Sequence, residues 1–245
     1  MKANITYIDH SGFFTEFSEV AFLFDYYQGD IPKTAKDKPL VVFVSHRHQD
    51  HYNPEIFELI NVYSEIYFVL AKGVPVKRQI EKYASLGMDL ESHIILIKKN
   101  VTELLTLNSG KTIEVTTLKS TDEGVAFLLS FEGKTIYHAG DLNQWVWEGE
   151  SKQYNDNMRN AYLKEMAKLD GLGIDVAFVP VDPRLEEHAF EGLTVFLEHA
   201  KAKTIYPMHL WGEYGIIDRF LEKHPEHSDA IRIIKKAGQL FVEEL

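Results

Sequence analysis

Short runs of β-branched and aromatic residues dominate the first 140 positions of the chain. Turn-forming residues separate these runs, and the combination predicts strands. The predicted strands are Asn4–Ile8, Phe13–Asp25, Leu40–Ser45, Glu65–Leu70, His93–Ile97, Glu103–Leu107, Thr112–Leu118, Val125–Phe131 and Lys134–His138. Two helices are predicted here, one at Pro54–Tyr63, which begins with the helix-start signal Asn53-Pro54, and one at Val76–Leu86. Ser11-Gly12 separates the first two predicted strands, and Glu132-Gly133 predicts a hairpin between the last two.

After Asp141 the pattern changes to an alternation of helices and short strands. The predicted elements are helices at Asn155–Leu169, His188–Ala200 and Gly215–Lys223, and strands at Asp175–Pro180, Lys203–Pro207, Ile231–Ile234 and Gln239–Glu243. The chain therefore has two halves that each run from strands to helices, without a linker rich in proline, glycine or serine. This pattern predicts an α/β fold with two sheets face to face and helices outside, in a single domain over residues 1–245.

A cluster of histidines lies at residues His46–His51, which read His-Arg-His-Gln-Asp-His. The buried strand Leu40–Ser45 is predicted before it, and a helix is predicted after it with Asn53 as N-cap and Pro54 at the first helical position. The cluster is therefore expected on a loop at the carboxyl end of a strand, where α/β proteins usually carry functional residues. Three imidazoles and a carboxylate within this loop predict a metal site.

Composition narrows the functional classes. The chain has no cysteine, which excludes disulfides, thiolate metal sites and cysteine nucleophiles. Its formal net charge of −11 and its lack of a long basic run argue against nucleic acid as a partner. A small-molecule substrate is expected instead, and a single anionic group could still be bound locally. With no signal-peptide pattern and no apolar run long enough for a membrane helix, a cytoplasmic enzyme without a membrane partner is predicted.

The spacing within the histidine loop predicts how it binds metal. Residues two apart in an extended segment point the same way, so His46 and His48 can hold one ion together. The chain must turn at Asp50 to enter the helix, so Asp50 and His51 can face a second ion. Imidazole ligands suit zinc, iron, nickel or copper, and added carboxylates also allow manganese or iron. Two such ions can hold a bridging hydroxide and polarise the bond that it attacks.

Four motifs resemble those of the metallo-β-lactamase superfamily. The loop His46–His51, after a hydrophobic strand, is similar to the signature of that superfamily. The segment ending Gly-Asp at Asp141 resembles its metal-bridging aspartate, and Tyr-Pro-Met-His ending at His209 resembles its last motif. Asp25 resembles the early aspartate that braces the histidine loop. The resemblance implies a four-layer αββα sandwich with the metals at one edge between the sheets. Within the superfamily, the segments Tyr7–Gly12 and His138–Asp141 most resemble the ascorbate-6-phosphate lactonase-like branch of metal-dependent hydrolases.

The resemblance implies two divalent metal ions, zinc or else manganese or iron, and a ligand set on seven positions. His46 and His48 hold the first ion with Asp122 as candidate third ligand; the remaining implied ligands are Asp50, His51 and His209 for the second ion and Asp141 as the bridge.

The sequence departs from the superfamily at the third ligand of the first ion. A histidine is usual there, but His93 is the only histidine between His51 and His138, and it comes too early in the strand order. Asp122, in the segment Lys119–Gly124, is the candidate replacement. The alternatives are Ser120 or Thr121 ordering a water, or no ligand at all.

Replacing that histidine with Asp122 changes the charge of the site. Asp50, Asp122, Asp141 and a hydroxide bring four negative charges to two divalent cations, so the two metals and their ligands are neutral together. A histidine would leave them one unit positive. We therefore predict a less acidic bridging water, a weaker attraction for anionic substrates, and a shift towards harder metals such as manganese or iron(II).

Three other histidines are candidates for roles near the site. His10 follows an apolar strand and belongs either to the rim of the site or to the structural framework. His138 ends a strand three residues before Asp141, and we expect it to hold the metal loop by a hydrogen bond. His188 precedes a predicted helix and either donates a proton to the leaving group or is a solvated helix-start residue.

Two polar residues and three tryptophans also have alternative roles. Asp182 and Arg184 follow a predicted strand and either contact substrate or form a structural turn. Trp145, Trp147 and Trp211 lie within a few residues of Asp141 or His209. They either form the wall of an apolar or sugar-binding pocket or pack in the core.

These observations predict a metal-dependent hydrolase that cleaves an ester, lactone or phosphoester of a small molecule. A metal-bound hydroxide is the expected nucleophile, with Asp50 orienting it and accepting its proton. Two alternatives belong to other classes. One is a nuclease-like phosphodiesterase of the same superfamily, and the other is a non-catalytic metal-binding protein with a degenerate first metal site.

Overall fold

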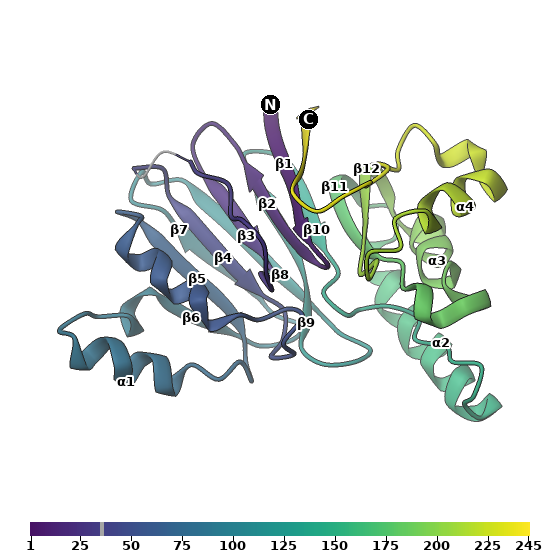
Figure 1. Cartoon of the computed structure of the whole chain (residues 1–245), viewed down its shortest axis with the longest axis horizontal. Coiled ribbons are helices and arrows are strands. Elements are labelled where there is room, and N and C mark those ends of the chain that lie inside the picture. The colour runs from purple at the N-terminus through teal and green to yellow at the C-terminus, as the bar shows by residue number, and fades with distance from the viewer. Residues whose placement is uncertain (35–36) are drawn as a thin grey trace. The chain divides into compact units, whose positions relative to one another are not determined.

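The computed structural model describes residues 1–34 and 37–245 (Figure 1). These residues fall into two compact units, and each unit is assembled from separate stretches of the chain. Unit 1 consists of Met1–Lys98, Leu105–Thr112 and Ala237–Leu245, whereas unit 2 consists of Lys99–Leu104 and Ile113–Lys236. Within the described residues, no helix combines the length and the apolar character that crossing a bilayer requires.

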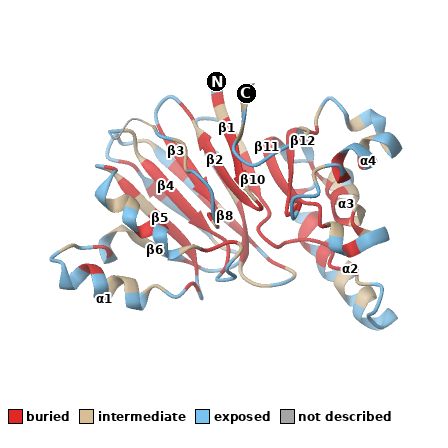
Figure 2. Cartoon of the chain, in the orientation of Figure 1, coloured by how far each residue is buried: buried red, intermediate tan, exposed pale blue. Residues whose placement is uncertain are grey.

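Unit 1 is built on a seven-stranded sheet in the order β13-β1-β2-β3-β4-β5-β6. The strands are β1 (Lys2–Asp9), β2 (Gly12–Glu16), β3 (Ala21–Phe24), β4 (Leu40–Val44), β5 (Ile66–Ala71), β6 (Ile94–Ile97) and β13 (Gln239–Glu244). Strands β3 to β6 are parallel, whereas β13, β1, β2 and β3 pair antiparallel. The parallel strands β3 and β4 are buried along their whole length (Figure 2), as their unbroken apolar sequences predict.

The strand order of unit 1 brings three chain segments to one edge of the sheet. Strands β1, β3 and β4 run in the same direction, because β2 lies antiparallel between β1 and β3. Their carboxyl ends are followed by His10, Asp25 and Ser45. The connection after β4 leads into the short helix η1 (Pro54–Asn61), and Asn53 caps it by accepting a hydrogen bond from the Glu55 backbone N–H.

Unit 2 is built on a six-stranded sheet in the order β12-β11-β10-β9-β8-β7. The strands are β7 (Thr102–Thr106), β8 (Thr112–Lys119), β9 (Val125–Phe131), β10 (Lys134–His138), β11 (Gly173–Pro180) and β12 (Lys201–Met208). Strands β10, β11 and β12 are parallel, so Asp141, Asp182 and His209 all follow carboxyl ends at the same edge. Strand β8 ends at that edge too, because β9 lies antiparallel between β8 and β10.

Helices connect the strands within each unit. Unit 1 contains η1, α1 (Lys77–Ser85) and η2 (Glu91–His93). The helices of unit 2 are α2 (Lys152–Met166), η3 (Ala167–Leu169), η4 (Pro183–His188), α3 (Glu191–His199), α4 (Ile216–Lys223) and η5 (Pro225–His227). The predicted hairpin is confirmed: Glu132 and Gly133 both have positive φ, at 50° and 74°, which is the conformation of a type I′ turn.

Most predicted elements are confirmed within a few residues, and four predictions are wrong in detail. The run Phe13–Asp25 is two strands rather than one, because the chain turns where the Phe17 backbone N–H donates to Val20 O. The helix predicted at Pro54–Tyr63 is a 3₁₀-helix that ends at Asn61. Helix α3 begins at Glu191 rather than His188, which closes η4. The strand predicted at Ile231–Ile234 is absent, since Ile231 forms only an isolated bridge to Ile205.

Candidate metal centre

Asp25 organises the histidine loop of unit 1. Its carboxylate is fully buried and accepts hydrogen bonds from the Ser45 backbone N–H at 2.7 Å, from the Ser45 hydroxyl at 2.6 Å and from His51 Nδ1 at 2.8 Å. Its backbone has a φ of 39°, an uncommon conformation for a non-glycine residue. The expectation that Asp25 braces the histidine loop is therefore confirmed.

The same hydrogen bonds determine which nitrogen of each imidazole carries a proton. The Ser45 hydroxyl donates its only proton to Asp25. It must therefore accept from His46 Nδ1, which lies 2.9 Å away. His51 likewise donates from Nδ1 to Asp25. In both rings the lone pair is consequently on Nε2, the tautomer in which a neutral imidazole can bind metal through that atom.

His46 and His48 present ring nitrogens that lie close together. Nε2 of His46 lies 3.0 Å from Nδ1 of His48. Two nitrogens that bind one ion at ~2.0–2.1 Å lie about 3 Å apart, so this spacing fits a shared metal. His48 is exposed and His46 is buried. The expectation from the alternating side chains, that these two residues point the same way, is confirmed.

His10 belongs to this cluster, although the predicted ligand set does not include it. Its Nε2 lies 3.3 Å from Asp50 Oδ2, and ligand atoms of His10, Asp50 and His51 all lie within 4.8 Å of one another. His10 is buried and has a φ of 53°. In the sequence, the position of His10 directly after a strand and before Ser11-Gly12 was the feature that indicated a place near the site. His93 lies elsewhere, with Nδ1 2.8 Å from Ile66 O.

Asp182 has the corresponding role in unit 2. It is fully buried, and one of its oxygens accepts a hydrogen bond from His209 Nδ1 at 2.8 Å. Burial acts to raise the pKa of Asp182, but hydrogen bonds from His209 and Arg184 outweigh it and lower the pKa to about 2. Nε2 of His209 then faces Asp141 Oδ1 at 3.4 Å. Asp182 also caps η4, which confirms the structural turn that was one of its two predicted roles. Its hydrogen bond to His209 was not predicted.

Several hydrogen bonds hold the loop that carries Asp141. The Gly140 backbone N–H donates to His138 Nδ1 at 3.2 Å, as expected for His138. The indole of Trp145 donates to Asp141 O at 2.8 Å, and the Thr121 hydroxyl donates to Asn143 O at 2.6 Å. Trp145 is buried beside the ring of His209, with ring centroids 5.4 Å apart. The loop that carries the Asp141 carboxylate is thus held in place by hydrogen bonds at several points.

Asp122 lies beside Asp141. One carboxylate oxygen of each lies within 4.8 Å of the other, and Asp122 is exposed. The Ser120 hydroxyl accepts from the Asp122 backbone N–H at 3.1 Å, and the Thr121 hydroxyl is engaged with Asn143. This placement is the one that a ligand role would require, and the ligand role itself stays a prediction.

The donors in each unit fit divalent metal ions. Unit 1 presents imidazole nitrogens of His46, His48 and His51 with the carboxylate of Asp50, and unit 2 presents His209 with Asp141. Mixed imidazole and carboxylate donors suit zinc, iron and manganese. The backbone φ of His209 is 65°, so it too sits in a conformation that is uncommon for a non-glycine residue.

Comparison with known proteins establishes the family. The model of the beta-lactamase superfamily domain matches residues 4–156, more than half of the chain. The chain belongs to the metallo-β-lactamase superfamily. The α/β fold class of that superfamily is therefore confirmed, as is the class of metal-dependent hydrolases. No curated protein matches the chain.

Three solved structures illustrate the likeness of fold. The metallo hydrolase Igni18 from Ignicoccus hospitalis KIN4/I matches with a TM-score of 0.63 at 18% identity, over 100% of both chains. A putative metal-dependent hydrolase from Parabacteroides distasonis ATCC 8503 matches with a TM-score of 0.59 at 20% identity, over 95% of this chain and 93% of that one. The short form of human tRNase Z matches with a TM-score of 0.58 at 13% identity, over 100% and 99%.

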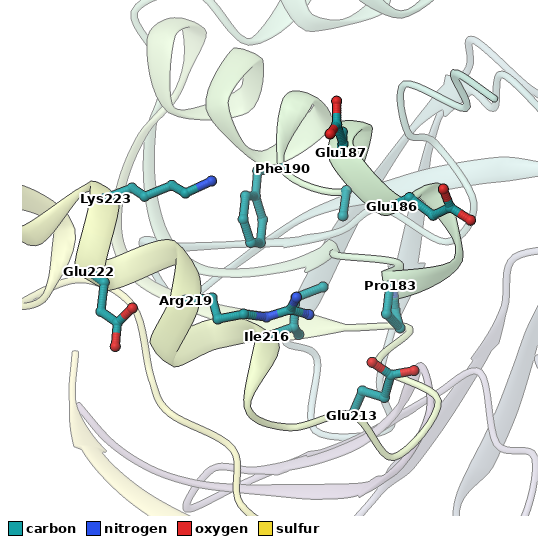
Figure 3. A pocket seen from close by; sticks show the side chains of 10 residues that line it. Pro183, Glu186, Glu187, Phe190, Glu213, Ile216, Arg219, Glu222 and Lys223 are labelled. Carbon is teal, nitrogen blue, oxygen red and sulfur yellow. The ribbon is translucent and has the colours of Figure 1, made fainter. Parts of the chain in front are cut away.

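Unit 2 also contains a hollow of about 550 Å³ between η4 and α4 (Figure 3). Phe190 and Ile216 give it an apolar part, and Arg219 and Lys223 extend into it from α4. Four glutamates complete its polar lining: Glu186, Glu187, Glu213 and Glu222. None of the candidate metal ligands is among the residues that line it, so this hollow is separate from the site described above.

Proposed function

We propose that the chain is a hydrolase that holds two divalent metal ions and cleaves an ester, a lactone or a phosphoester of a small molecule. The observation that carries the proposal is a matched pair of buried histidines, His51 and His209, one in each unit. Each donates its Nδ1 proton to a buried carboxylate at 2.8 Å. Histidines that bind catalytic metals are characteristically held this way, because the bond to the carboxylate fixes the ring and keeps Nε2 available.

The ligand assignment follows the resemblance and agrees with the donor geometry inside each unit. The proposed ligands are His46, His48 and Asp122 for one ion, Asp50, His51 and His209 for the other, and Asp141 as the bridge. Within unit 1 the spacing of His46 and His48 supports their part of this assignment. Within unit 2 the facing atoms of His209 and Asp141 support theirs.

Bound divalent ions would supply Lewis acidity and lower the pKa of a coordinated water towards neutrality. We assign Asp50 to orient the attacking water and accept its proton. Its side chain is 25% exposed and has Nε2 of His10 at 3.3 Å, so it has both access to solvent and a partner for its charge. Asp25 and Asp182 act through the imidazoles, which they keep in the tautomer with an unprotonated Nε2.

The test measures metal content and turnover in parallel. The purified chain is loaded with zinc, manganese or iron(II), and anomalous scattering locates the bound ions. Hydrolysis is then screened with esters, lactones, phosphomonoesters and phosphodiesters. Replacing His48 or Asp141 with alanine should abolish metal-dependent turnover while circular dichroism stays unchanged. His199→Ala is the matched control, because His199 also pairs with a carboxylate, Asp170, at 2.6 Å.

Each outcome has a defined meaning. Full activity in either alanine variant would overturn the mechanism. A clear preference for phosphodiesters would favour the phosphodiesterase class, and a metal-loaded chain that is inert on the whole panel would favour a non-catalytic binding protein. Asp122→Asn tests the charge argument: we expect lower metal occupancy and a reduced preference for manganese or iron. Unchanged metal content in that variant would remove Asp122 from the ligand set.

A further inference from the structure

The brace of His209 extends to the surface of unit 2 through Arg184. The guanidinium donates to the Asp182 carboxylate from Nε at 3.0 Å and from Nη2 at 2.6 Å. Asp182 also accepts from the Arg184 backbone N–H at 2.8 Å, so the start of η4 and the side chain are fixed together. A single buried carboxylate therefore links a proposed metal ligand to a cation that is 49% exposed.

Two indoles flank this cation. The Arg184 Cζ lies 4.5 Å from the ring of Trp211 and 6.0 Å from the ring of Trp147. Trp211 itself donates from Nε1 to Asp182 at 3.3 Å. A guanidinium that lies over aromatic faces is held in place by cation–π attraction and is less hydrated than an ammonium group.

The same aromatic cluster reaches the candidate metal ligand. The ring of His209 has Trp145 at 5.4 Å and Trp211 at 5.6 Å, measured between ring centroids. Trp145 and Trp147 are stacked nearly parallel at 6.4 Å. Arg184 and Trp211, both about half exposed, thus lie at the outer end of a set of rings whose inner end is the buried His209.

Bracing His209 explains Asp182 but not the rest of this arrangement. The brace needs an ionised carboxylate, which the Arg184 guanidinium favours. It does not require that guanidinium to be half exposed or to lie over two indoles. A guanidinium carries five N–H donors, so one that donates to Asp182 from Nε and Nη2 has further N–H groups with which to bind a planar or tetrahedral anion. With a formal net charge of −11, the chain as a whole repels anions, so a local cation is what such recognition would require.

We propose that Arg184, which lies over the rings of Trp147 and Trp211, binds an anionic group of the substrate, so that the site selects small esters or lactones that carry a carboxylate or a phosphate. This inference rests on the proposed hydrolase function for its substrate class. Arg184 is then a specificity-determining residue, and the two indoles position its guanidinium.

A binding measurement tests the anion site without any turnover. All three tryptophans of the chain belong to this cluster, so intrinsic tryptophan fluorescence reports on it directly. The metal-free protein is titrated with inorganic phosphate and, separately, with acetate. We expect a saturable change with at least one of these anions, lost in Arg184→Met. Arg219→Met is the matched control, because Arg219 is an exposed arginine of the same unit that lies in the separate hollow.

A kinetic measurement tests specificity in the metal-loaded protein. Three aryl esters of similar size are compared, one neutral, one with a carboxylate and one with a phosphate. In Arg184→Met the ratio of kcat/KM for the preferred anionic ester to that for the neutral ester should fall about ten- to a hundredfold, the loss of a charge-assisted hydrogen bond. Arg184→Lys should fall between wild type and Arg184→Met, since lysine keeps the charge but not the fork. The ratio should not change in Arg219→Met.

The outcomes separate the two proposals. If the wild-type protein hydrolyses esters but its ratio is the same in Arg184→Met, the anion site is wrong and the hydrolase stands. If the wild type shows no saturable fluorescence change with either anion, the anion site is also wrong. If phosphate or acetate binds and the binding depends on Arg184 while no substrate is hydrolysed, the anion site stands and the proposed hydrolase function fails. The preferred anion distinguishes a phosphate from a carboxylate substrate.

Discussion

Asp25 in unit 1 and Asp182 in unit 2 perform the same task in different surroundings. Both are fully buried, and both hold a histidine by accepting from its Nδ1 at 2.8 Å. Asp25 also accepts from the backbone N–H and the hydroxyl of Ser45, which are neutral and buried. The other partners of Asp182 are Arg184 and Trp211, which are about half exposed.

This difference separates an internal brace from one that is connected to the surface. If the carboxylate of Asp25 is removed, its donors remain in the interior without an acceptor. If the carboxylate of Asp182 is removed, the Nδ1–H of His209 loses its acceptor in the interior, but the side chains of Arg184 and Trp211 can turn towards water and recover hydrogen bonds there. The first brace should therefore matter mainly for stability, and the second mainly for the metal site and for whatever Arg184 binds.

The largest effect on stability is expected for Asp25→Ala. The substitution leaves the Ser45 N–H and His51 Nδ1–H buried without an acceptor, which should lower the free energy of unfolding by about 3–5 kcal/mol. Urea denaturation followed by circular dichroism measures this loss. Asp182→Ala, studied alongside, should lose less. Equal losses in the two variants would contradict the distinction between the two braces, as would a loss below about 1 kcal/mol in Asp25→Ala.

The next effect concerns metal affinity in Asp182→Asn. Without the carboxylate, the ring of His209 is less well oriented and less basic, so affinity for zinc should fall about 10- to 100-fold. Competition with a chromophoric chelator measures the affinity. Asp170→Asn is the control, because Asp170 pairs with His199 at 2.6 Å but is 61% exposed and is not among the proposed ligands. A similar loss in both variants would show that the effect is not specific to the brace.

The smallest effect on stability is expected at Asp175, a mostly buried carboxylate of unit 2 that holds no histidine. It serves as a baseline for the two braces. Asp175 accepts from Lys203 Nζ at 2.7 Å and from the Thr135 backbone N–H at 3.0 Å. Burial acts to raise the pKa of Asp175, but these two hydrogen bonds and the nearby Lys134 outweigh burial and lower it.

A carboxylate whose pKa is lowered on folding stabilises the folded state above its unfolded pKa. That contribution disappears as the pH falls through the folded pKa. Asp175→Asn should therefore cost about 1 kcal/mol at neutral pH, and the cost should shrink below about pH 4. Urea denaturation of wild type and variant at pH 7 and pH 3 measures both. A cost that grows on acidification would contradict the assigned partners.

The sequence allowed much of the framework to be predicted, because strands and turns depend on local patterns. The hairpin at Glu132-Gly133 and the cap at Asn53 need only neighbouring residues, and both are confirmed. The turn between β2 and β3 was missed because Phe17 and Val20, which close it, are themselves apolar and buried. The prediction of a strand at Ile231–Ile234 failed because apolar residues alone do not determine whether a strand finds a partner.

Asp182 and His10 show where local patterns no longer suffice. Asp182 follows β11 and His209 follows β12, and they meet because the register of these strands pairs Pro180 with Met208. His10 follows β1 and approaches Asp50 because β1 ends at the same edge as β4. Neither encounter could be predicted, since strand order and register depend on contacts between residues far apart in the chain.

By itself, the sequence determined the family, the types of donor and their positions at the ends of strands, because a motif and a hydrophobic pattern are carried by neighbouring residues. The tertiary structure decided which carboxylate holds which histidine and which ring nitrogen is left for a metal. It also brought the guanidinium of Arg184 over two indoles. Those facts depend on hydrogen bonds and packing between separate strands and loops, and these form only when the sheets are assembled.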